Sequence, residues 1–180
     1  KVSTFFYSSE YPEWVCSQFN DFFLTLLDSK FVPNQNQSAN PSDKNIAFYD
    51  AGGGNIYPLG VNLAFGNTGL FKQCENGQTG CNMTAVQSTT NACTGTTMLA
   101  GTGFDIQKPP SPPGLKCCCG NNDLAGGGTG WLKMSGNVKP GETIKLRFVI
   151  WDTSDAYYDS LVLLDGFEWS VSASTPGVSE

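Results

Sequence analysis

The 180-residue sequence contains no histidine. Its absence excludes a Ser-His-Asp or Cys-His catalytic pair, a zinc or copper site with imidazole ligands, and a histidine switch near neutral pH. Charged residues are scarce at 14 %, and the formal net charge is −6. Nucleic acid and anionic membranes require clustered basic side chains, so neither is expected as a partner. We expect no enzyme, and a carboxylate pair acting on a glycoside is the remaining catalytic alternative.

The sequence also lacks an apolar run of about 18 residues, so no membrane-spanning helix is expected. No secretory leader is recognisable at its start, and Lys1 opens directly into a strand-like segment. These features are typical of a processed or excised portion of a longer protein. A chain of 180 residues can form one domain with a continuous core.

Seven cysteines indicate an oxidising compartment, where disulfides form and persist. A metal–thiolate site is the alternative, but zinc sites need close cysteine pairs in two places, and this sequence has one tight cluster. The odd count leaves at least one cysteine free, bonded to another chain or paired elsewhere. Adjacent cysteines seldom pair with each other, so the three consecutive ones are expected to reach different partners among the others. The candidate disulfide-forming residues are Cys16, Cys74, Cys81, Cys93, Cys117, Cys118 and Cys119.

Short apolar segments separated by turn residues and polar loops predict an all-β protein. The strands are expected at residues 1–7, 19–27, 45–50, 57–65, 129–134, 143–151 and 161–164. Residues 66–130 are interpreted as a cysteine-rich insertion, because so long a loop in a compact domain needs cross-links, here disulfides, or a functional role. The polar end of the chain predicts a linker at residues 172–180. We therefore expect one antiparallel β-sandwich domain over residues 1–171, with a long disulfide-stapled loop region.

The segment from residue 148 to residue 169 contains the clearest candidate site. An apolar run, expected to be a buried strand, leads into a loop with Asp152, Asp155 and Asp159, and a second apolar run follows. Glu10 and Asp21 are expected to converge on this loop. Calcium prefers such oxygen ligands, and carboxylates packed this closely need a cation or raised pKa values. The alternative is a structural corner in which each carboxylate accepts backbone N–H bonds.

Aromatic residues near the polar loops are candidates for stacking on sugar rings. Trp14, Tyr157 and Tyr158 are the ligand-binding candidates, and Tyr157 and Tyr158 point opposite ways if that segment is extended. The other tryptophans at positions 131, 151 and 169 are expected to pack in the core.

Two separated blocks of the sequence resemble the choice-of-anchor L domains of bacterial surface proteins. The first is FFYSSEYPEWVCSQFNDFF at residues 5–23, and the second is KPGETIKLRFVIWDTSDAYYDSLVLLDGFEW at residues 139–169. The segment Asn45-Ile46-Ala47 stands where the family tends to carry the same three residues. The resemblance covers about half of the chain, with the blocks in the family's order.

The resemblance implies a β-sandwich of jelly-roll type that serves as a module of secreted or cell-surface proteins. Three features depart from the family's pattern: Ser9 stands where glutamate is common, Cys16 replaces a small residue, and residues 66–130 are expanded. The family's N-terminal strands are expected before Lys1 and are missing. Such an open edge invites pairing, so another segment or chain is expected to fill it.

The expected function is therefore adhesion or ligand binding by an extracellular module that calcium stabilises, with a surface glycan or a protein as its ligand. The alternative is a subunit of an extracellular assembly or filament, joined to neighbouring subunits by strand addition.

Overall fold

The computed structural model of the chain describes residues 1–80, 92–107 and 124–180, and the fold in these ranges is all-β, as predicted. Two 3₁₀ helices, η1 (Val61–Leu63) and η2 (Thr97–Leu99), are the helical elements of the described ranges. The strands are β1 (Val2–Ser8), β2 (Phe22–Asp28), β3 (Phe48–Asp50), β4 (Ile56–Gly60), β5 (Ile106–Gln107), β6 (Leu124–Ala125), β7 (Gly127–Gly128), β8 (Leu132–Ser135), β9 (Lys145–Trp151), β10 (Ser160–Asp165) and β11 (Gly177–Ser179).

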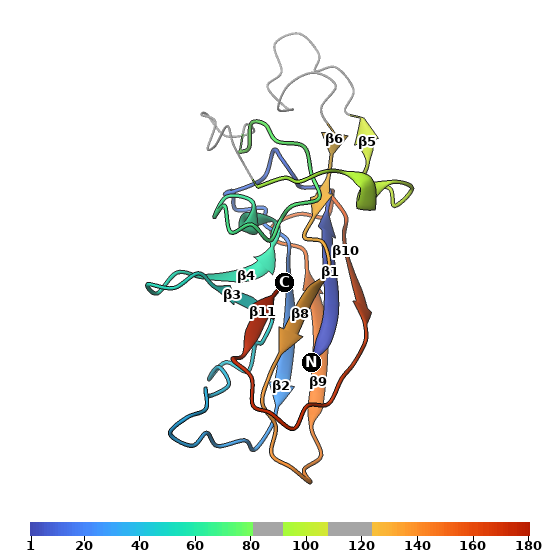
Figure 1. Cartoon of the computed structure of the whole chain (residues 1–180). Helices are drawn as coiled ribbons and strands as arrows, with labels where there is room; N and C mark the ends of the chain where they lie inside the picture. The colour runs from blue at the N-terminus through green and yellow to red at the C-terminus, as the bar shows by residue number, and fades with distance from the viewer. Residues whose placement is uncertain (81–91, 108–123) are drawn as a thin grey trace.

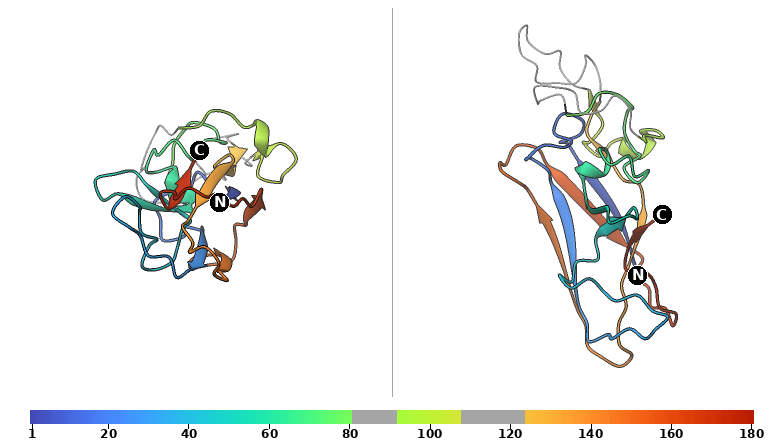
Figure 2. Two further views of the ribbon diagram at one scale, coloured as in Figure 1. Left: turned by 60° about the horizontal axis from the view of Figure 1, so that its bottom comes forward. Right: turned by 90° about the vertical axis from the view of Figure 1, so that its left-hand side faces the viewer.

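Nine of these strands form two antiparallel sheets that pack face to face (Figures 1 and 2), and β5 and β6 pair with each other in a separate two-stranded sheet. One sheet has the order β10-β1-β8-β11, with β7 also paired to β1, and the other has the order β3-β4-β2-β9. Strand β9 therefore ends one sheet and β10 ends the other. The prediction of an antiparallel sandwich is confirmed at this level, whereas the jelly-roll topology stays a prediction.

The core follows from the alternation of side chains along the central strands. In β1, Val2 and Phe6 face the other sheet, where they join Phe23 and Leu27 of β2 in the main hydrophobic cluster. Phe5 and Tyr7 point to the outer face of β1. That face is covered by the insertion, whose Leu99 and Phe104 form a second buried cluster with them. Strand β1 is thus buried on both faces.

The described parts of the insertion lie at one end of the sandwich, at the top of Figure 1. Within its described parts, Phe71 and Leu99 are buried, and Lys72 and Gln73 both donate backbone N–H groups to the carbonyl of Gly128. Residues 66–80 and 92–107 therefore pack against the sandwich as part of the domain. Four of the cysteines, Cys81, Cys117, Cys118 and Cys119, lie outside the described residues.

Three predictions about the later part of the chain are wrong. The region predicted as a linker contains β11, which pairs with β8 and buries Val178. The two apolar runs that flank the acidic loop are strands, but β9 and β10 are partly exposed edge strands because they end their sheets. Trp131, Trp151 and Trp169 were expected in the core and are exposed.

Two buried threonines face the interior without a hydrogen-bond partner among the described residues. Thr4 and Thr25 are fully buried, and their Oγ1 atoms are unpartnered. A buried hydroxyl that has no partner costs about 1–3 kcal/mol. We expect Thr25→Val to raise the free energy of unfolding by about 1 kcal/mol, because valine keeps the shape and removes the hydroxyl. Urea unfolding of both proteins measures the change, with Thr143→Val, at an exposed threonine before β9, as the control. A loss of stability in Thr25→Val would contradict the prediction.

Candidate functional site

The acidic residues singled out from the sequence meet at one end of the sandwich because of the strand register. Strand β1 ends at Ser8, which lies opposite Ser160 of β10. Strand β2 begins at Phe22, which lies opposite Trp151 of β9. The segment after β1, the residue before β2 and the loop between β9 and β10 therefore lie together. We call this group, Glu10, Asp21, Asp152, Asp155 and Asp159, the acidic corner.

Glu10 and Asp21 form the buried part of the acidic corner, with exposed fractions of 3 % and 2 %. The backbone N–H of Asp21 donates to Oε2 of Glu10 at 2.6 Å. The carboxylate of Asp21 accepts the backbone N–H of Thr153 at 3.3 Å and the hydroxyl of Ser160 at 2.7 Å. Glu10 follows β1 and Asp21 precedes β2, so these bonds join the two sheets across the end of the sandwich.

Burial shifts the pKa values of both carboxyl groups upward. The pKa of Glu10 is raised to about 8, mainly because the carboxyl group is removed from water. The hydrogen bond from the Asp21 backbone N–H lowers this pKa, whereas the negative charges of Asp21, Asp152 and Asp155 raise it. Burial also raises the pKa of Asp21, while the bonds from Ser160 and Thr153 oppose the shift. At neutral pH and without a cation, Glu10 is therefore mostly protonated. The repulsion expected from the sequence is relieved by this proton.

The remaining acidic side chains lie closer to solvent. Asp152 and Asp159 are exposed, and Asp155 is half-buried and accepts the N–H of Tyr157 at 3.1 Å. The carbonyl of Asp159 accepts the N–H of Ser9 at 3.0 Å, which fixes the end of the loop against the first block. Within residues 1–80, 92–107 and 124–180, no group of three or more acidic or cysteine side chains has a geometry that could hold a metal ion.

Hydroxyl side chains that the sequence analysis did not single out hold the acidic loop in place. The Thr153 hydroxyl donates to the carbonyl of Asn20 at 3.0 Å, and the Ser154 hydroxyl donates to that of Gln18 at 3.2 Å. The available signal was the placement of Thr153, Ser154 and Ser160 beside aspartates, since such residues commonly bond to nearby backbone.

A close approach of strand β4 completes the corner. A Cβ atom on Gly60 would lie 2.5 Å from the carbonyl oxygen of Asp21 and 3.0 Å from the Cβ of Phe22. A side chain at this position would push β4 away from the residue that joins the two sheets. Gly60 is therefore required by the packing next to Asp21.

The three aromatic candidates lie at the same end as the acidic corner. The ring of Trp14 packs edge-on against Phe19 at 4.8 Å and lies 5.9 Å from the ring of Tyr158. Tyr157 is 84 % exposed, and Tyr158 is also exposed. The backbone N–H of Trp14 donates to the carbonyl of Glu10 at 2.9 Å, so this aromatic group is directly connected to the corner.

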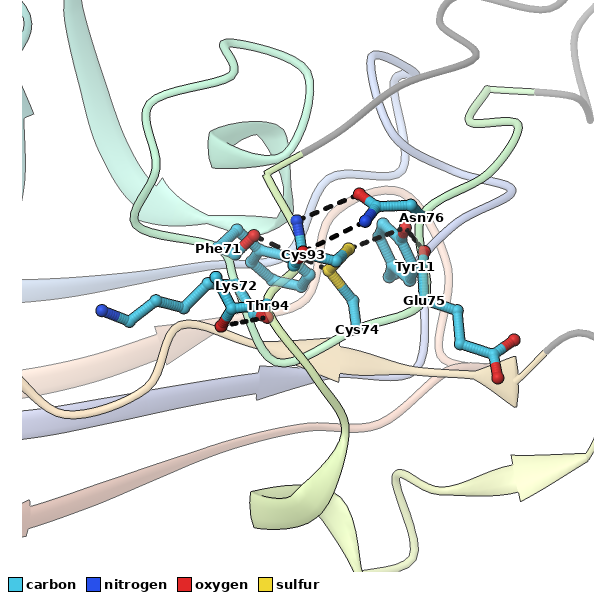
Figure 3. Close-up of a disulfide and its surroundings, with 8 residues drawn as sticks. All are labelled: Tyr11, Phe71, Lys72, Cys74, Glu75, Asn76, Cys93 and Thr94. Carbon is cyan, nitrogen blue, oxygen red and sulfur yellow. Dashed lines mark hydrogen bonds between the residues drawn. A yellow bond between two sulfur atoms is a disulfide. The ribbon is translucent and has the colours of Figure 1, made fainter.

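One disulfide, between Cys74 and Cys93, ties the described parts of the insertion together beside the first block (Figure 3). The Tyr11 hydroxyl donates to the carbonyl of Glu75 and lies 3.5 Å from Sγ of Cys93. Asn76 exchanges two hydrogen bonds of 3.1 Å with the backbone of Cys93. The insertion is thereby held next to the residue that follows Glu10.

The expected cysteine pairing is partly wrong. Cys74 and Cys93 pair with each other, so neither is available to the three consecutive cysteines. Cys16 was named as a further disulfide candidate, and in the structure it carries a free, half-buried thiol. The predicted partners of the other cysteines lie outside the described residues.

A cavity of about 560 Å³ lies away from the acidic corner, with none of the corner residues in its lining. Its interior is formed by apolar side chains from both sheets, and the segment between β10 and β11 lies along one side. The lining includes Leu27, Ile46, Met134, Leu146 and Trp169.

Comparison with known proteins identifies the family. The family model of the choice-of-anchor L domain matches residues 3–169, while no curated protein and no solved structure gives a significant match. This family is a surface-anchor module and not a known enzyme family. Among the described residues, no helix is long and apolar enough to cross a membrane. Since the match covers most of the 180 residues, the chain belongs to the choice-of-anchor L domain family, which implies a bacterial secreted or cell-surface protein.

Proposed function

We propose that the chain is an adhesion or ligand-binding module whose acidic corner is stabilised by calcium. The observation that supports this proposal is the meeting of two buried carboxyl groups, Glu10 and Asp21, with Asp152 and Asp155 from the far end of the chain. Calcium takes oxygen ligands in flexible geometry and competes with the proton on Glu10. The loop between β9 and β10 adjusts its exposed carboxylates to complete the calcium shell.

The ligand surface that we propose lies beside this corner. Trp14, Tyr157 and Tyr158 offer aromatic faces at the same end of the sandwich, and flat aromatic rings stack on sugars and on protein side chains. Calcium would fix the loop that carries both tyrosines. A glycan array probed in calcium tests the ligand class, and an array without any bound glycan removes the carbohydrate part of the proposal.

Calcium is expected to raise the thermal unfolding temperature of the protein, because a ligand that binds only the folded state stabilises it. At a calcium concentration about 100 times Kd, the gain is about 2.7 kcal/mol. Differential scanning calorimetry in calcium and in EDTA measures the effect. The double variant Glu10→Gln/Asp21→Asn should lose the response, and Asp165→Asn, which removes an exposed carboxylate elsewhere on β10, should keep it. Equal unfolding temperatures of the wild type in calcium and in EDTA would contradict calcium binding at the acidic corner.

A second candidate function is assembly by strand addition. The observation that favours it is that β9 and β10 are the end strands of their sheets and expose large apolar side chains. An exposed apolar edge is a template for pairing with another chain. Size measurement of the purified protein across a concentration series distinguishes this candidate from a monomeric module.

A further inference from the structure

The two sheets are open along the side formed by β9 and β10. Each of these strands has one neighbour, β2 for β9 and β1 for β10, and its other edge has no strand partner among the described residues. The two strands also contact each other across the sandwich. Both free edges therefore lie on the same side of the molecule, and a partner that reaches one of them also reaches the other.

Side chains that face the interior are exposed along this open side. Phe148 lies opposite Thr25 and Ile150 lies opposite Phe23, so both share the inner face of β2. Their exposed fractions are 43 % and 47 %, whereas Phe23 is 2 % exposed. On the other sheet, Leu164 lies opposite the buried Thr4 and is 40 % exposed. The hydrophobic core is therefore incompletely buried where the two edge strands face each other.

The edge of β9 has one feature that discourages pairing, its two cations, and lacks a proline, an inward-pointing charge and a short length. It is seven residues long and contains no proline, and no charged side chain points inward. Its two cations, Lys145 and Arg147, lie on the outer face, because Leu146 and Phe148 between and after them face inward. A partner strand can therefore add to β9 without burying a charge.

We propose that a second copy of this chain pairs through β9, antiparallel and centred on Phe148, so that the two copies complete each other's core. This inference rests on the assembly function proposed above and names its partner. In this register Phe148 meets Phe148 of the second copy, and Leu146 meets its Ile150. On the outer face Lys145 meets Trp151 of the second copy, a favourable cation–aromatic contact, and Arg147 meets its Val149.

The residue pattern of β9 is self-complementary in this register, which favours a copy of the same chain as its partner. The register places no cation opposite a cation and no apolar inward residue opposite a polar one. The chain has a net charge of −6, but β9 carries two cations and no acidic residue, so pairing of β9 with its own copy brings no acidic residues of the two strands together. A two-fold axis through Phe148 pairs the free β9 edges of both copies with each other, and the result is a dimer instead of a filament.

Sedimentation velocity from about 1 µM to about 1 mM tests the proposal on the 180-residue chain. The wild type is expected to form a dimer, and Ile150→Lys should weaken its association at least tenfold. Ile56→Lys is the matched control, because Ile56 is also an exposed isoleucine but lies in the hairpin of β3 and β4. Circular dichroism of both variants shows whether they fold. On mild oxidation Phe148→Cys should form a covalent dimer in which peptide mapping finds residue 148 bonded to residue 148, whereas Ile56→Cys should form no bond between two copies of residue 56.

A wild type that stays monomeric over this range overturns the proposal. A dimer that Ile150→Lys and Ile56→Lys weaken equally overturns the assignment to β9. A ladder of larger species overturns the two-fold dimer and leaves assembly by strand addition intact, so failure of the inference and failure of the second candidate function are distinguishable. If Ile150→Lys does not fold, the cross-link at position 148 decides the question.

Discussion

The stability of the protein is expected to fall as the pH rises from 4.5 to about 8, the interval between the ordinary pKa of Glu10 and its pKa in the folded protein. Below this interval Glu10 is protonated in both the folded and the unfolded state. Within it, the folded state holds a proton that the unfolded state has lost, so each further pH unit costs at most about 1.4 kcal/mol. Above it, both states are ionised and the contribution of the buried neutral carboxyl group is lost.

Urea unfolding of the wild type and of Glu10→Gln, repeated across this interval in EDTA, measures the effect. Glutamine resembles the neutral carboxyl group and does not titrate, so the variant should lose most of the decline. Asp21 adds a smaller decline of the same sign, because burial also raises its pKa. Comparing the two proteins cancels the contributions of groups whose effect on stability changes with pH in the opposite direction. Asp28 is one of them, because its pKa is lowered by its bond from Lys44. Parallel profiles for the two proteins would show that Glu10 does not keep its proton on folding.

The same titration separates the two ways in which the corner can be neutralised. Calcium binds ionised carboxylates, so it must displace the proton from Glu10, and its apparent affinity should increase with pH across the same interval. A protein that holds only a proton loses stability there whether or not calcium is added. A protein that binds calcium recovers that stability when the ion is present. The pH profile in calcium and in EDTA therefore distinguishes a calcium corner from a hydrogen-bonded corner.

The sequence predicted the elements of the fold better than their arrangement. The apolar alternation of residues 1–7 and the run at 143–151 correspond to β1 and β9 because local patterns carry strand signals. Burial of β9 was predicted from its apolarity and is wrong, because exposure depends on the position of a strand within its sheet. Strand β11 was missed for a related reason: its sequence is polar, and its pairing with β8 is a long-range contact.

The acidic corner was predictable in composition and only partly in detail. The hypothesis of an oxygen-ligand site required Glu10 and Asp21 to meet the loop at 152–159, and the register of β1 with β10 and of β2 with β9 brings them together. The proton on Glu10 was not predictable, because its cause is the burial of that carboxyl group at the end of the sandwich. Disulfide pairing depends on spatial distance, so spacing alone did not identify the Cys74–Cys93 bond.

Asp21→Ala is expected to lower the free energy of unfolding by about 2–4 kcal/mol, the second large effect at this corner. The Asp21 carboxylate belongs to the segment that enters β2, and it accepts hydrogen bonds from Ser160 of β10 and from Thr153 in the acidic loop. Removing it breaks both of these bonds between the two sheets, while the bond from the backbone N–H of residue 21 to Glu10 remains. The substitution also removes the cost of burying this carboxylate and its repulsion with Asp152 and Asp155, which offsets part of the loss.

Asp21→Asn separates the hydrogen bonds from the charge. Asparagine keeps one acceptor oxygen in the same place, so in EDTA it should cost less than Asp21→Ala, whereas any gain of stability from calcium should disappear in both variants. Asp165→Ala, an exposed aspartate at the far end of β10, is the control and should change the free energy of unfolding by less than about 0.5 kcal/mol. If Asp21→Ala lowers the free energy of unfolding by no more than this control, the Asp21 side chain does not join the two sheets. The function of this end of the sandwich then does not depend on Asp21 and Glu10.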